Sequence, residues 1–164
     1  MAIKNPFALK ALEHLELVEK MCEATTRESL DAMQDRVKAL TPVSEPDWRN
    51  NVPGKLKTSI TTTPVAAAND TYRGAVFSEV EYAPFVEYGT APHEIRATNA
   101  QALRLADGRF FAKVDHPGYR GAHMFRRGAT AAADDARTRI ERHAGILRHQ
   151  LGRAGIVDMA VLVL

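Results

Sequence analysis

Three histidines and an aspartate in the middle of the chain could together bind a metal ion. Asp115 directly precedes His116, and His93 and His123 lie on either side of them in the sequence. Imidazole and carboxylate groups are common ligands of catalytic zinc, which activates water for hydrolysis. Their spacing matches no compact metal-binding motif, and both His93 and His116 neighbour a proline. A metal-dependent hydrolase is therefore one hypothesis, and histidines that hydrogen-bond the backbone of turns are the other.

Carboxylates and possible nucleophiles are the other groups in the chain that could take part in catalysis. Glu79, Glu81, Glu87 and Glu94 could supply paired carboxylates for general acid–base catalysis, or they could form a solvated sheet face or pair with arginines of an adjacent subunit. No serine stands in a Gly-x-Ser-x-Gly elbow. The single cysteine, Cys22, falls in a helical apolar stripe and is expected to be a small core residue. We therefore predict that the chain is not an enzyme and has no catalytic residue, cofactor or metal ion.

Arginines are concentrated in the last third of the chain, where they could contact nucleic acid. The acidic residues Asp134, Asp135 and Glu141 are interleaved with them, which is also typical of a solvated helix face. The formal net charge of +2 is too small to indicate nucleic acid by itself. The arginines in question are Arg120, Arg126, Arg127, Arg137, Arg139, Arg142, Arg148 and Arg153.

The composition is that of an ordinary globular protein. The chain has 164 residues, of which 45% are apolar and 26% charged, and this favours a single domain over residues 1–164. Its N-terminus has no apolar segment of signal-peptide length. The longest purely apolar run, residues 159–164, is far shorter than the roughly 20 residues that cross a bilayer. We expect a soluble protein that is made in a cytoplasm and contacts no membrane.

A long helix is predicted at each end of the chain. Apolar residues recur at steps of three and four from Leu9 to Leu40, and Asn5-Pro6 favours a helix start just before them. The predicted helix over residues 6–40 would be on the order of 50 Å long at about 1.5 Å per residue, which exceeds the diameter of a domain this small. Part of it should therefore project or pack on another subunit. The same period returns over residues 124–151.

Strands are predicted between the two helices. After a proline-rich loop over residues 41–56, β-branched residues predict a strand at 57–63, and alternation predicts another at 72–80. Residues 85–88 would form a third short strand or the start of a helical turn, because Pro84 favours an edge or a break. We expect one mainly antiparallel sheet of three to five strands over residues 57–91.

Residues 92–118 are predicted to form a projecting β-hairpin excursion around the turn dipeptide Asp107-Gly108. Residues 156–164 are strongly apolar and would be a final strand or an arm docked on a partner. The predicted fold class is α+β, with the long N-terminal and C-terminal helices packed on one face of the sheet.

The most specific motif is Tyr82-Ala83-Pro84-Phe85-Val86-Glu87-Tyr88-Gly89-Thr90, followed after the excursion by His116-Pro117-Gly118. Together with Thr41-Pro42-Val43, residues 54–60 and Met124-Phe125-Arg126, this order resembles the head–tail joining proteins of siphophages, which include neck, tail-completion and tail-terminator-like minor tail components. The resemblance covers about residues 6–150. The chain departs from that family in a longer loop at 44–53 and in His123-Met124-Phe125, where the family has Pro-Phe-Leu.

The resemblance implies a structural protein of a bacteriophage virion. Such a protein forms a homo-oligomeric ring, commonly a hexamer, that completes or terminates the tail and joins it to the capsid connector. Its implied partners are connector, adaptor or stopper proteins and tail tube or tail terminator proteins, and genome DNA passes through its lumen without sequence-specific binding. It would be assembled in the host cytoplasm and located at the head–tail junction. A nucleic-acid-binding module that uses the arginine-rich C-terminal helix is the alternative.

The two ends of the excursion are the expected subunit or partner interface. Tyr82 and Tyr88 are rigid amphipathic side chains of the kind favoured at interfaces, and Gly89 allows a sharp change of direction. Glu87 is expected to pair with an arginine of a neighbouring subunit. The expected interface residues are Tyr82, Phe85, Glu87, Tyr88, Gly89, Thr90, Arg109, Phe111, His116, Pro117 and Gly118.

Overall fold

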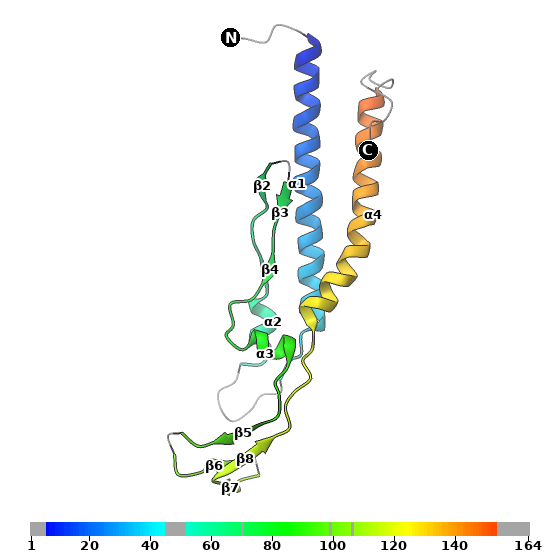
Figure 1. Ribbon diagram of the computed structural model, residues 1–164. Helices are drawn as coiled ribbons and strands as arrows, with labels where there is room; N and C mark the ends of the chain where they lie inside the picture. The colour runs from blue at the N-terminus through cyan, green and yellow to red at the C-terminus, as the bar shows by residue number, and fades with distance from the viewer. Residues whose placement is uncertain (1–5, 45–51, 70, 99, 106, 154–164) are drawn as a thin grey trace.

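Figure 1 shows a computed structural model of the chain, which describes residues 6–44, 52–69, 71–98, 100–105 and 107–153. Two long helices, α1 (Pro6–Leu40) and α4 (Met124–Arg153), lie side by side and run in opposite directions. One β-hairpin lies along α1, and a second projects beyond the ends of the helices. The predicted C-terminal arm at 156–164 lies outside the described residues.

The long helices begin where the sequence predicts, and each end has a local cause. α1 ends at Leu40 because the following Thr41 precedes a proline and so avoids helical backbone. The Thr41 hydroxyl donates to the Val37 carbonyl over 2.7 Å, which satisfies one of the last free carbonyls of the helix. α4 begins at Met124 and ends at Arg153, two residues beyond the predicted end.

Polar pairs fix the register between α1 and α4. These pairs are Thr25–His143, Glu28–Arg142 and Arg36–Asp135. Near the start of α4 the two backbones approach closely, because a Cβ atom on Gly128 would lie 2.5 Å from the Cγ2 atom of Val37. The helices therefore pack tightly at this end and are joined by polar contacts further along.

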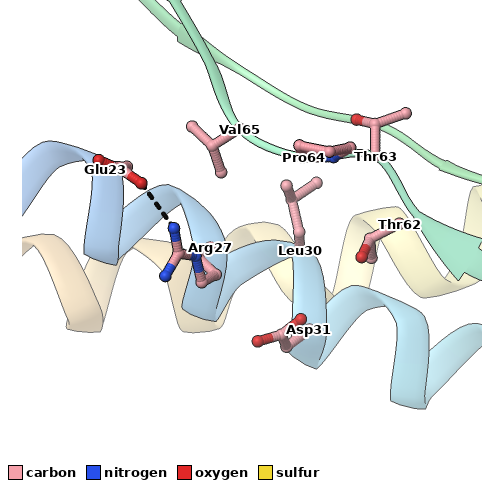
Figure 2. Close-up of a pocket in the computed structure, with 8 residues that line it drawn as sticks. All are labelled: Glu23, Arg27, Leu30, Asp31, Thr62, Thr63, Pro64 and Val65. Carbon is pink, nitrogen blue, oxygen red and sulfur yellow. Dashed lines mark hydrogen bonds and ion pairs between the residues drawn. The ribbon is translucent and has the colours of Figure 1, made fainter.

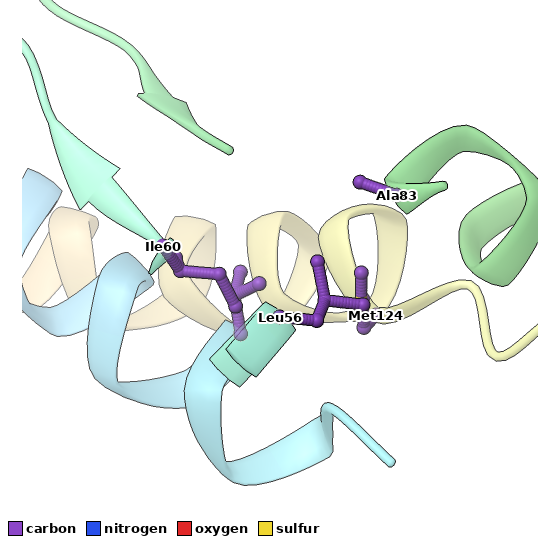
Figure 3. Close-up of a cluster of buried hydrophobic side chains, with 5 residues drawn as sticks. Leu56, Ile60, Ala83 and Met124 are labelled. Carbon is purple, nitrogen blue, oxygen red and sulfur yellow. The ribbon is translucent and has the colours of Figure 1, made fainter. Parts of the chain in front are cut away.

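The buried core is small and lies where the long helices meet two short ones, α2 (Lys55–Ser59) and α3 (Ala83–Tyr88). Figure 3 shows Leu56, Ile60, Ala83 and Met124 in this cluster. Val37 of α1 completes it, and Ile60 is 1% exposed. Cys22, which was expected in the core, is exposed on α1.

The strands of the described residues form four two-stranded antiparallel ladders, so the expectation of one sheet of three to five strands under both helices is wrong. The pairs are β1 (Thr61–Thr62) with β4 (Val76–Phe77), and β2 (Ala66–Ala68) with β3 (Thr71–Arg73). These two ladders make one long hairpin. The hairpin is interrupted where the backbone of Gly74 packs on α1, since a Cβ atom there would lie 2.2 Å from Leu30 Cδ1.

The strand predicted at 57–63 is wrong over most of its length. Residues 55–59 are helical as α2, and only Thr61–Thr62 is extended. The physical reason is that Leu56 and Ile60 are four residues apart, so a helical turn buries both in the core. The predicted strand at 72–80 is present in two pieces, β3 and β4, and residues 85–88 take the helical alternative as part of α3.

The projecting hairpin excursion is confirmed. β5 (His93–Arg96) pairs with β8 (Lys113–His116), and further out β6 (Leu103–Arg104) pairs with β7 (Phe110–Phe111). Gly108, in the predicted turn, has a φ of 86°, a backbone conformation that glycine adopts readily. We call residues 92–118 the arm. With two long helices and small antiparallel hairpins, the α+β fold class is confirmed.

The small core predicts that single truncations inside it are costly. Replacing Ile60 with alanine should lower the free energy of unfolding by about 2–5 kcal/mol, because Ile60 is buried among core side chains. Ile140→Ala is the matched control, since Ile140 is 58% exposed and should lose less than about 1 kcal/mol. Chemical denaturation followed by circular dichroism measures both, and equal losses would contradict the position of the core.

Candidate functional site

Helix α3 turns its aromatic side chains to the surface. Tyr82, Phe85 and Tyr88 recur every three residues, so a helical turn places them on one face. Phe85 is 60% and Tyr88 72% exposed, whereas Ala83 and Glu87 on the other face are buried. In a strand, Phe85 would point away from Tyr82 and Tyr88. The helical conformation is therefore what gathers three aromatic rings on one surface.

A fourth aromatic side chain, the exposed Tyr119, extends this surface. We call Tyr82, Phe85, Tyr88 and Tyr119 the aromatic patch. A groove of about 260 Å³ opens beside it, and its walls include Val43, Val52, Val86, Tyr82 and Tyr119. Val43 and Val52 are themselves more than half exposed. Exposed aromatic and apolar side chains grouped around a groove in this way are typical of a protein–protein contact.

Glu87 lies behind the aromatic patch and caps α4. The N–H groups of Phe125 and Arg126 donate to its two carboxylate oxygens over 2.9 and 3.1 Å. The first turn of α4 contains no acidic residue of its own, so the buried Glu87 carboxylate supplies the negative charge that a helix N-terminus favours. The expectation that Glu87 pairs with an arginine of a neighbour is therefore corrected, because Glu87 is 5% exposed and its carboxylate is hydrogen-bonded within its own chain.

The base of the arm is a close crossing of two backbone segments. Thr90 and Tyr119 exchange two backbone hydrogen bonds of 2.8 and 2.9 Å. Gly89, just before this bridge, has a φ of 83°, and a Cβ atom on it would lie 2.0 Å from the Tyr119 carbonyl oxygen. A Cβ atom on Gly118 would lie 2.5 Å from the Thr90 carbonyl oxygen. Both glycines are thus required by the crossing from which the arm departs.

Within the arm, the predicted interface residues lie in two groups. His93 and His116 are cross-strand partners near the base, and their rings stack with centroids 5.1 Å apart. Near the tip, the Arg109 guanidinium lies 5.5 Å from the centroid of the Phe111 ring. Pro117 is exposed between β8 and the base. The arm thus holds Arg109 against Phe111, and His116 against His93, which is not among the expected interface residues.

The residues of the metal hypothesis do not converge. His93 and His116 are neighbours, and Asp115 is the cross-strand partner of Glu94, but His123 directly precedes α4. Across the described ranges, no three His, Cys, Asp or Glu side chains are grouped as a metal site would need. The Nδ1 atoms of His93 and His116 hydrogen-bond the Ala91 carbonyl and the Gly118 N–H, respectively. Both histidines therefore match the alternative that assigned them to turn backbone.

A second groove, of about 520 Å³, lies between α1 and the hairpin segment 62–65 (Figure 2). Glu23 and Arg27 form an ion pair of 2.5 Å on its α1 wall, and Leu30 and Asp31 follow along the same helix. The Glu23 and Arg27 side chains are 46% and 64% exposed. Acid–base catalysis would instead need a carboxyl group held in an apolar pocket.

The arginines of α4 are partly used within the chain. Arg142 pairs with Glu28, whereas Arg126, Arg127, Arg137 and Arg148 are exposed and form no ion pair within the described part of the chain. The exposed Asp134 and Glu141 lie among them. The nucleic-acid alternative stays a prediction, and its signature would be binding that weakens steeply with salt.

Sequence reasoning missed two exposed aromatic residues. Tyr119 completes the aromatic patch, and Phe110, at 67% exposed, stands near the tip of the arm. For Tyr119 the sequence offered one signal, its position directly after His116-Pro117-Gly118. For Phe110 the sequence offered none, because alternation within a short hairpin does not say which face packs.

A small α+β protein whose distinctive features are an exposed aromatic patch and a projecting arm belongs to a class that works through contacts with other proteins. A sequence profile of the family described as "Bacteriophage HK97-gp10, putative tail-component" matches residues 7–89, from α1 to α3. The chain belongs to this family of bacteriophage tail components, which confirms the resemblance to head–tail joining and minor tail proteins and gives it a structural role in a phage virion.

The chain was also compared with curated proteins and with solved structures. The comparison with curated proteins found no match, and neither did the comparison with solved structures. Among the helices within the described ranges, none has a segment that is both long and apolar enough to cross a membrane.

The cap formed by Glu87 gives a testable effect on stability. Glu87→Ala should lower the free energy of unfolding by about 3 kcal/mol, because two partly buried N–H groups of α4 lose a charged acceptor. Glu87→Gln retains one acceptor oxygen and should lose less. Glu81→Gln, on an exposed carboxylate nearby, is the control and should be neutral. A Glu87→Ala variant as stable as the wild type would refute the capping role.

The base of the arm gives a second test. Gly89→Ala should cost about 3–5 kcal/mol, because positive φ and collision with the Tyr119 carbonyl act together. Gly108→Ala is a matched control with a φ of 86° and open space around the added Cβ atom, so it should cost only about 1–2 kcal/mol. Hydrogen exchange should show that the Thr90 and Tyr119 amides lose protection in the first variant only.

Proposed function

We propose that the chain is a ring-forming structural protein of the head–tail interface. It completes or terminates the tail and joins it to the capsid connector, as a homo-oligomer that is commonly hexameric. Its partners are connector, adaptor or stopper proteins and tail tube or tail terminator proteins, and the genome passes through the lumen without sequence-specific binding. The protein carries no catalytic activity. Membership of the tail-component family supports the structural part of this proposal.

The observation that carries the proposal is the aromatic patch on and beside α3. Phe85 and Tyr88 are among its most exposed side chains, yet they sit on a helix that the buried Ala83 and Glu87 hold in place. Large rigid aromatic side chains that are pre-organised in this way are favoured anchors at protein interfaces because little side-chain entropy is lost on binding. The patch fits a surface that another protein covers.

The extended shape supports assembly independently. The arm projects beyond the ends of the two long helices, and all four residues of β5 are exposed. A projecting arm and an exposed aromatic patch on one subunit are the elements that contacts with neighbours or with a stacked ring require.

Truncating the patch tests the proposal. The double variant Phe85→Ala/Tyr88→Ala should unfold like the wild type, because both side chains are exposed, but should assemble into rings or join tails roughly tenfold less well or worse. Leu15→Ala, at an exposed apolar residue on α1, is the control. Native mass spectrometry of the purified chain, alone and with purified tails or connectors, measures the assembly.

Two outcomes would overturn the proposal. One is a wild-type chain that stays monomeric and joins neither tails nor connectors at any concentration tested. The other is a double variant that assembles as well as the wild type, which would remove the aromatic patch as the interface.

A further inference from the structure

The α1 wall of the groove in Figure 2 carries an alternating row of charges. Glu23, Arg27 and Asp31 follow one another at steps of four, so they stand in line along one side of the helix. Leu30 and Val65 supply apolar surface in the same groove. We call Glu23, Arg27 and Asp31 the α1 row. Along it the side chains are negative, positive and negative.

The outer side of α4 carries the reverse pattern. At about 100° per residue, Arg137, Glu141 and Arg148 lie within a narrow sector of the helix. That sector is roughly opposite the one from which Asp135 and Arg142 contact α1. We call Arg137, Glu141 and Arg148 the α4 row. Along it the side chains are positive, negative and positive. All three residues are exposed, and no ion pair links them to another described residue.

The spacing of the two rows matches an antiparallel helix pair. Within one chain, α1 and α4 pair residue 25 with 143, residue 28 with 142 and residue 36 with 135. The same register, applied to the α4 of a second copy beside the groove, pairs Glu23 with Arg148, Arg27 with Glu141 and Asp31 with Arg137. Every one of these pairs joins opposite charges.

We propose that the groove between α1 and the hairpin binds α4 of a second copy of this chain, with the α1 row facing the α4 row. This inference rests on the proposed ring and names its lateral contact. The two rows lie on different faces of one molecule, so each copy offers its groove to one neighbour and its α4 to the other. A heterologous contact of this kind generates a closed ring when the rotation between copies closes.

Breaking the Glu23–Arg27 ion pair to form this contact costs little free energy. The Glu23–Arg27 ion pair lies between exposed side chains four residues apart, and such a pair stabilises a helix only weakly. Small residues on α4, including Ala144 and Gly145, let its backbone approach the groove, and a Cβ atom on Gly145 would meet nothing within 4 Å. Charges that pair there become partly desolvated, which strengthens their attraction.

Reversing each row tests the contact. The variant Glu23→Arg/Asp31→Arg makes the groove wholly basic, and Arg137→Glu/Arg148→Glu makes the outer side of α4 wholly acidic. Each variant alone should associate roughly tenfold or more weakly than the wild type, because like charges then face each other. An equimolar mixture should recover association, since the basic α1 row of the first variant can bind the acidic α4 row of the second, and the unchanged α1 row of the second can bind the unchanged α4 row of the first. Lys57→Glu/Arg73→Glu, at exposed positions outside both rows, is the matched control.

Native mass spectrometry and analytical ultracentrifugation measure the size of the assemblies. Loss in each variant and recovery in the mixture, with even-numbered mixed rings, support the contact. If the wild type forms rings and both variants do so equally, or if the mixture fails to recover, the contact is wrong while the ring stands. If the wild type forms no ring alone or on purified tails, the proposed function fails together with the contact.

Discussion

The buried carboxylate of Glu87 is the interaction on which the arrangement of the molecule depends. It holds the first turn of α4 against α3, and two further hydrogen bonds, from the Ala122 and His123 N–H groups to the carbonyls of Val86 and Glu87, close the same junction. The chain enters the arm directly after this point and returns to it directly before α4. One junction therefore sets the direction of the long helix, the aromatic patch and the arm relative to one another.

The long helices could be predicted because their signal is long and periodic, and the hairpin turn because Asp107-Gly108 is specific. The short elements could not be predicted, because their conformation depends on partners far away in sequence. Thr-rich residues 57–63 look extended locally, yet Leu56 and Ile60 are drawn into a helical turn by a core that Met124 and Val37 complete. The prediction of a single sheet was wrong for the same reason, because the pairing of each short strand depends on distant partners and the ladders form separately.

The sequence predicts which residues belong to the candidate site, but it predicts their roles only in part. Tyr82, Phe85 and Tyr88 could be chosen as interface residues by type, but only the helical turn of α3 shows that they share one exposed face. The sequence predicts that Glu87 is a charged residue on the surface. Its burial depends on a helix that begins near Met124, and no local pattern shows this contact. Gly89 was identified correctly as a turning point, although the reason, contact with Tyr119, is tertiary.

The position of the core at one end of the helices has a mechanical consequence. Val37, Met124 and their neighbours form the buried base of the molecule, and α1 and α4 extend beyond it, where the polar pairs Glu28–Arg142 and Thr25–His143 link them. A helix on the order of 50 Å long that tilts by about 5° about such a base moves its far end by about 4 Å. A tilt of this kind would move the far end most and the place where the short helices meet least. A ring of such subunits could adjust its diameter there without disturbing the junction at the other end.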